Sequence, residues 1–95
     1  MKTISVESLS EASNYAIIKL PERKYPALLI QGDSLRILLD LAQEIQRMVR
    51  NSSDEELRST VDELAEQLSS RVEHYEQVLT NEHMDLPYTP FKRAV

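Results

Sequence analysis

Few residues in this 95-residue chain have the types and spacing that catalysis or metal binding requires. His74 and His83 are the only histidines and stand nine positions apart, whereas paired metal ligands on a helix are separated by about one turn. The chain has no cysteine, which excludes disulfides, thiolate catalysis and cysteine metal sites. Its single glycine excludes the glycine-rich phosphate loops of nucleotide enzymes. We therefore expect no catalytic residue, no metal site and no cofactor.

Carboxylates are plentiful, and their distribution is uneven. Residues 51–83 carry nine acidic residues against Arg58 and Arg71, a net charge of −7, whereas the whole chain has a net charge of −5. This argues against nucleic-acid binding, which needs a basic face. It is compatible with a basic protein partner that is attracted electrostatically. The alternative is a solvated helix face that keeps a small protein soluble.

Length and composition predict one small domain over residues 1–95. The chain is 41% hydrophobic and 28% charged, which is ordinary for a globular protein. No apolar run approaches the ~20 residues of a membrane span, and the N-terminal segment lacks the apolar region of a secretory signal. We expect a cytoplasmic protein that does not associate with membranes.

The first third of the chain, residues 3–31, reads as strands. An alternating segment comes first, and the two apolar runs at residues 15–20 and 27–31 follow it. Pro21 and Pro26 bound the loop between those runs, because proline cannot donate to a strand ladder. This pattern predicts an antiparallel strand pair that is apolar on both faces. One face should be covered by the helix that follows, and the other by the C-terminal tail or a second subunit.

Helical periodicity predicts one helix over residues 33–50 and a second over residues 54–81. At the first helix, Gly32 permits a positive φ or a close approach, and Asp33 or Ser34 can cap the helix. The sequence therefore predicts an α+β fold. A short antiparallel β-sheet of about three strands is followed by a two-helix antiparallel hairpin with a long, acidic second helix, and residues 84–95 form an irregular tail.

The start of the second helix has a capping-box pattern, in which Ser53 is followed three positions later by Glu56. At 1.5 Å per residue, this helix should extend about ten residues beyond the first. Apolar side chains continue along that overhang, where water contact would make them an unusual patch. We predict self-association through this stripe, made of Leu68, Val72, Tyr75, Val78 and Leu79. The alternative is a tail that folds back and covers the stripe with Leu86, Tyr88 and Phe91.

The strongest local pattern joins a strand, a proline-bounded basic turn, a second strand and a helix. It consists of Asn14-Tyr15-Ala16-Ile17-Ile18-Lys19-Leu20-Pro21, Arg23-Lys24-Tyr25-Pro26 and Ile30-Gln31-Gly32-Asp33-Ser34-Leu35. On these residues the chain resembles a small bacterial family catalogued as a domain of unknown function, over roughly residues 3–50. More distantly, the strand–Gly-Asp-Ser-Leu–helix unit is similar to part of the HicB-like antitoxin fold. The first resemblance implies a fold and a bacterial source, and the second implies an antitoxin-like or immunity-like role.

These observations favour a non-enzymatic protein-interaction module that acts as a homodimer or binds one protein partner. The alternative is a small-ligand-binding or regulatory domain, with a pocket between the sheet and the helix over residues 33–50. Its polar groups would come from Tyr15, Tyr25 and Gln31. An enzyme is a third reading, which no residue constellation supports.

Overall fold

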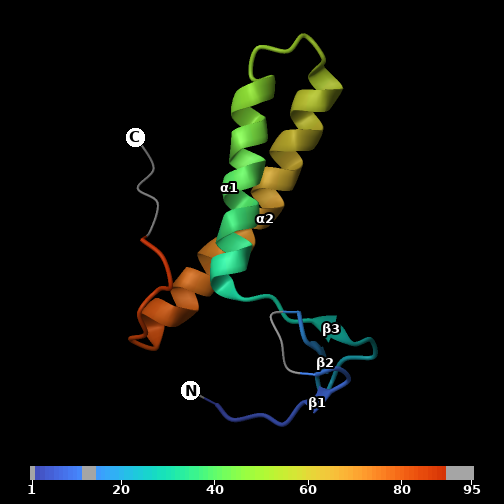
Figure 1. Cartoon of the computed structure of the whole chain (residues 1–95), viewed down its shortest axis with the longest axis vertical. Helices are drawn as coiled ribbons and strands as arrows, with labels where there is room; N and C mark the ends of the chain where they lie inside the picture. The colour runs from blue at the N-terminus through green and yellow to red at the C-terminus, as the bar shows by residue number, and fades with distance from the viewer. Residues whose placement is uncertain (1, 12–14, 90–95) are drawn as a thin grey trace. The chain divides into compact units, whose positions relative to one another are not determined.

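The computed structural model describes residues 2–11 and 15–89 (Figure 1). The chain divides into two compact units, one that ends at Gln31 and one that begins at Gly32. The first unit is a small sheet and the second is a helical hairpin with the segment that follows it. The predicted α+β class, with a three-stranded antiparallel sheet followed by two helices, is confirmed.

The sheet has the strand order β1-β2-β3 and is antiparallel throughout. The strands are β1 (Glu7–Ser8), β2 (Ile17–Lys19) and β3 (Ala27–Leu28). The central strand pairs Ile18 with Ser8 on one side and with Ala27 on the other. All three strands are shorter than predicted.

Backbone hydrogen bonds outside the strands extend the sheet by one step on each side. Leu9 N donates to Ile17 O, and Leu29 N donates to Ala16 O, both at 2.8 Å. Beyond these bonds the predicted loop takes over, and Arg23 N donates to Leu20 O at 3.2 Å. Pro21 stands directly after Leu20 and cannot donate to a ladder, which limits the length of β2.

The hairpin consists of α1 (Gly32–Val49) and the longer α2 (Glu55–Asn81) (Figure 1). Asp54 caps α2, since its Oδ1 accepts a hydrogen bond from Leu57 N at 3.0 Å. The prediction that Ser53 makes the cap was wrong by one position. Asp54 is itself positioned by Ser52, whose hydroxyl accepts from Asp54 N at 3.1 Å.

The end of α2 is closed by two backbone hydrogen bonds. Met84 N donates to Leu79 O at 2.9 Å, and His83 N donates to Thr80 O at 3.1 Å. This is the Schellman arrangement, which places a left-handed residue directly after the C-cap. His83 takes that position with φ 56°, where glycine is the usual residue. The structure thereby gives His83 a role in the backbone turn.

Candidate functional site

The hairpin is held by a narrow apolar seam between its two helices. Near the middle of the seam the side chains are small, which lets the helix backbones approach closely. A polar contact also joins the two helices, in which Gln46 Nε2 donates to Asp62 Oδ1 at 3.0 Å. The seam residues are Leu35, Leu39 and Ala42 from α1 and Val61, Ala65 and Val72 from α2, all buried.

The five residues predicted as an interface lie in different surroundings on α2. Val72 is 3% exposed and belongs to the seam. Leu68, Tyr75 and Leu79 are half-buried, and Val78 is exposed. The predicted ten-residue overhang is too long, because α1 already begins alongside Tyr75. Self-association through these five residues stays a prediction.

The predicted junction at the start of α1 depends on a close approach. Gly32 has no positive φ, so the turn does not require glycine. A Cβ at Gly32 would instead overlap the ring of Tyr75. Asp33 also bonds the first turn, since its Oδ1 accepts from Ser34 N at 2.8 Å. The junction residues therefore have a structural role.

A second set of large apolar side chains lies along the hairpin and is exposed. On α1 the set extends over most of the helix, from Ile37, 59% exposed, to Met48, 75% exposed. On α2 it includes Leu64, 48% exposed. We call this set the apolar face, and its members are Ile37, Leu38, Leu41, Ile45, Met48, Leu57, Leu64 and Val78.

The apolar face lies on one side of the hairpin. Leu41 directly precedes the seam residue Ala42 in α1, and Leu64 directly precedes the seam residue Ala65 in α2. One step along a helix is a turn of ~100° in a fixed sense. Two antiparallel helices that face one another are related by a two-fold rotation about the normal to the hairpin plane. Positions that precede the seam therefore emerge on the same side of both helices, and the apolar face spans both.

The opposite side of the hairpin is polar, for the same geometric reason. The residues that directly follow the seam positions are charged or carry an amide. Three acidic side chains of α2, those of Asp62, Glu66 and Glu73, directly follow seam positions and therefore lie away from the apolar face. We call this second surface the polar face, and it includes Arg36, Asp40, Gln43, Asp62, Glu66 and Glu73.

The segment after α2 meets the polar face through Tyr88. The Tyr88 hydroxyl donates to Glu76 Oε2 at 2.7 Å, and the Arg36 guanidinium lies 5.5 Å from the centre of the tyrosine ring. Burial, followed by the hydrogen bond to Glu76, raises the pKa of Tyr88 above its ordinary value. Tyr88 therefore folds back onto the hairpin, as the alternative prediction for the tail expected. It contacts Arg36 and Glu76, neither of which belongs to the predicted stripe. Phe91 lies outside the described residues.

Sequence reasoning did not define the apolar face as one surface that spans both helices. It expected the apolar side chains of the first helix to contact the sheet and the second helix. The signal was the width of the apolar stripe, which exceeds what one amphipathic face needs. Leu38, Leu41 and Leu64 directly precede seam positions and belong to the apolar face, whereas the residues directly after the seam positions belong to the polar face. This pattern in the sequence distinguishes the two surfaces.

The structure bears on two further kinds of site, a metal centre and a membrane span. Over residues 2–11 and 15–89, no group of three or more His, Asp or Glu side chains is placed to hold a metal ion. Within the same ranges, neither helix is both long enough and apolar enough to cross a bilayer.

Comparison with known proteins gives one match. Residues 1–88 match a family described as "Family of unknown function (DUF6959)". No curated protein and no solved structure matches the chain. The match agrees with the predicted resemblance to a family of unknown function and extends it beyond residues 3–50. Similarity to HicB-like antitoxins is not shown.

Proposed function

We propose that this chain, which belongs to the family of unknown function DUF6959, is a non-enzymatic protein-interaction module that pairs with a second copy of itself. The observation that carries the proposal is the apolar face, which spans both helices of the hairpin. An antitoxin-like or immunity-like role, expected from the sequence, is one specific form of this proposal. We also propose a cytoplasmic location, as expected from the sequence.

A two-helix hairpin is a single layer, and its seam buries only one stripe of each helix. Stable domains are built from at least two layers around a shared core. An apolar surface that continues along two helices is a feature of interaction sites. The length of the apolar face, from Ile37 to Met48 on α1 and from Leu57 to Val78 on α2, suits a second layer made of helices.

A second copy of the hairpin meets the requirements of such a layer. In a two-fold dimer each copy presents the same surface, so an apolar patch meets an apolar patch. Two hairpins packed face to face form a four-helix bundle. The acidic residues Asp62, Glu66 and Glu73 lie on the polar face and would not be buried between the copies. The negative charge of these three residues therefore does not oppose the pairing at close range.

Sedimentation equilibrium tests the proposal directly. The wild-type chain at micromolar concentration should have twice the 11.0 kDa mass of one chain. Leu41→Glu together with Ile45→Glu places two charges in the centre of the apolar face. This variant should sediment as a monomer and keep its helical circular dichroism, because neither residue belongs to the seam.

The matched control adds the same two charges elsewhere. Gln43→Glu with Ser70→Glu changes residues that lie off the apolar face, and it should remain a dimer. A wild-type chain that is still monomeric at ~100 μM, well above the range of a specific ~1,600 Å² interface, would refute the proposal. The partner that covers the apolar face would then be residues 2–31 or a different protein. A basic partner for the acidic residues, expected from the sequence, would be such a protein.

A further inference from the structure

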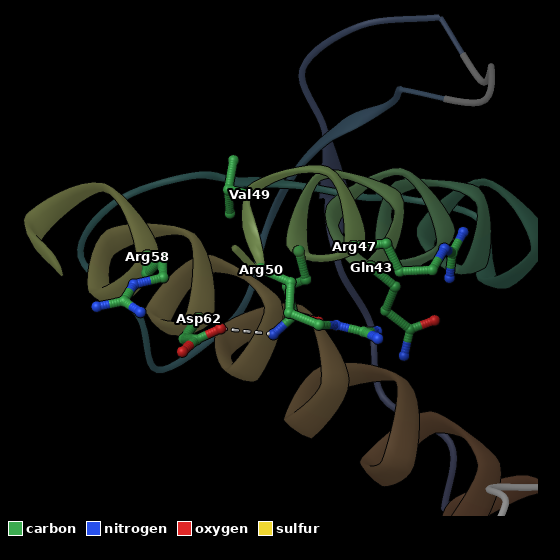
Figure 2. A pocket seen from close by; sticks show the side chains of 7 residues that line it. Gln43, Arg47, Val49, Arg50, Arg58 and Asp62 are labelled. Carbon is green, nitrogen blue, oxygen red and sulfur yellow. Dashed lines mark hydrogen bonds between the residues drawn. The ribbon is translucent and has the colours of Figure 1, made fainter. Parts of the chain in front are cut away.

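A hollow of about 460 Å³ opens on the hairpin near the end where α1 is joined to α2 (Figure 2). Val49 is the only apolar residue in its lining, and Asp62 is the only acidic one. The remaining lining residues all carry N–H donors. They are Gln43, Gln46, Arg47, Arg50 and Arg58.

The single carboxylate in the lining is already engaged. Asp62 Oδ1 accepts a hydrogen bond from Gln46 Nε2 at 3.0 Å, across the two helices (Figure 2). Arg58 stands four positions before Asp62 on α2, but a base that precedes an acid at this spacing forms the weaker of the two possible orders. The lining therefore has few free acceptors for its many donors.

Arg58 shows the consequence of this imbalance. Its Nε is buried and has no hydrogen-bond partner in the described part of the chain. A terminal nitrogen of Arg58 lies 3.9 Å from Glu55 Oε1, at the long end of the ion-pair range. Buried donors in folded proteins are almost always satisfied, so the unpaired Nε marks a local excess of donors over acceptors at this end of the hairpin.

The other two arginines are only weakly neutralised. Arg47 pairs with Glu44, and both side chains are more than half exposed, so solvent screens the pair. Arg50 lies exposed beside them at the end of α1. The hollow thus collects positive charge in a chain whose net charge is −5.

We propose that this hollow binds a small polyanion whose phosphoryl or carboxylate groups lie at two separate points. Arg58 lies in α2, Arg47 lies in the last turn of α1 and Arg50 directly follows α1, and Figure 2 shows Arg58 extending in a different direction from the other two. A ligand with two anionic groups would place one beside Arg58 and the other beside Arg47 and Arg50. The volume lies in the range of small-molecule sites, roughly 300–1,000 Å³.

The site is independent of the proposed dimer. Gln43 and Asp62, which line the hollow, belong to the polar face, so pairing through the apolar face leaves the hollow open. The guanidinium groups supply the planar donor pairs that suit phosphate and carboxylate oxygens.

Titration of the full chain with pyrophosphate and, separately, with citrate tests the proposal by two-dimensional proton–nitrogen NMR. We expect saturable shifts of the Arg58 Nε–H and Gln46 side-chain resonances, with a stronger response to one of the two probes that identifies the preferred anionic group. Acetate, with a single charge, should bind at least tenfold more weakly. Arg58→Gln with Arg50→Gln should weaken binding of the preferred probe by at least tenfold, with the amide spectrum otherwise retained.

Arg71→Gln is the matched control. Arg71 lies on the same helix, bonds Gln67 within that helix and does not line the hollow. This variant should bind the preferred probe within twofold of the wild type. Shifts that stay linear up to ~10 mM probe, or an equal loss of binding in the Arg71 variant, would show a general ionic effect and overturn the proposal.

Discussion

Gly32, the first residue of α1, lies so close to the ring of Tyr75 on α2 that a side chain at this position would overlap the ring. The contact joins the N-terminal end of α1 to the C-terminal half of α2. It also explains why the only glycine of the chain stands at this junction. The close approach, and not a left-handed backbone, requires the missing side chain.

Gly32→Ala should destabilise the protein by about 1 kcal/mol. The added methyl displaces the end of the Tyr75 ring, which can swing away but loses its packing. Alanine is otherwise the better helix residue. A lower free energy of unfolding therefore indicates crowding against Tyr75, whereas a higher one indicates that helix propensity dominates. Thermal or urea unfolding measures the change in stability that Gly32→Ala causes in two backgrounds, the wild type and Tyr75→Ala. In the Tyr75→Ala background the substitution should be neutral or stabilising. A stabilising Gly32→Ala in the wild-type background would contradict the contact.

Asp54→Ala should lower the free energy of unfolding by ~1 kcal/mol, because it removes the acceptor for Leu57 N at the start of α2. Ser53→Ala is the control, since the sequence pattern predicts Ser53 as the cap and the structure does not use it. That variant should change stability by less than ~0.5 kcal/mol. Urea denaturation of the two variants compares them, and a larger effect at Ser53 would restore the sequence-based assignment.

His83→Gly should stabilise the protein by roughly 0.5–1 kcal/mol. His83 has φ 56°, a left-handed conformation that costs a side-chain-bearing residue energy and costs glycine little. His74→Gly provides the contrast, because His74 lies inside α2 and replacing histidine by glycine there lowers helix propensity by roughly 0.4 kcal/mol. Differential scanning calorimetry should therefore show melting temperatures that move in opposite directions. Parallel shifts would show that the turn at His83 is not maintained in solution.

Tyr88 should make stability fall at high pH. Its pKa is raised in the folded chain by burial and by the bond to Glu76, whereas an unfolded tyrosine titrates near 10. The folded state therefore retains the proton more tightly. The contribution is fully present below about pH 10 and is lost as the pH rises above that value.

Tyr88→Phe should remove this part of the pH dependence and the most basic step of the tyrosinate absorbance titration. Tyr75→Phe is the control, and it should leave the Tyr88 step in place. If the wild type and Tyr88→Phe unfold with the same pH profile between about pH 9 and 12, the contact with Glu76 is absent in solution.

The order of the elements could be predicted from the sequence because it depends on local signals. Pro21 and Pro26 mark the loop between two strands, and apolar periodicity marks both helices. Strand lengths were overestimated, since β propensity does not tell where hydrogen-bonded pairing stops. The cap of α2 was misplaced by one residue for a similar reason: Ser53 and Asp54 both suit an N-cap, and only the backbone geometry chooses between them.

The candidate site was harder to predict than the fold. The position of α1 relative to Tyr75 depends on how far α2 slides along α1, and helix lengths alone do not give that offset. The hollow lined by Arg47, Arg50 and Arg58 also arises only when the two helices are paired, because its lining comes from both sides of the loop that joins them. Neither feature has a signature within a single element.

The contacts along the seam between α1 and α2 should form in a definite order during folding. Contacts next to the loop join residues close in the chain, such as Gln46 and Asp62, whereas the Gly32–Tyr75 contact closes a much longer segment. Closing a longer loop costs more entropy, so the hairpin should zip from the loop toward Gly32. The hairpin should open in the reverse order. In α1, the hydrogen-bonded amides that follow the first four unpaired N–H groups should exchange with solvent sooner than those near Val49.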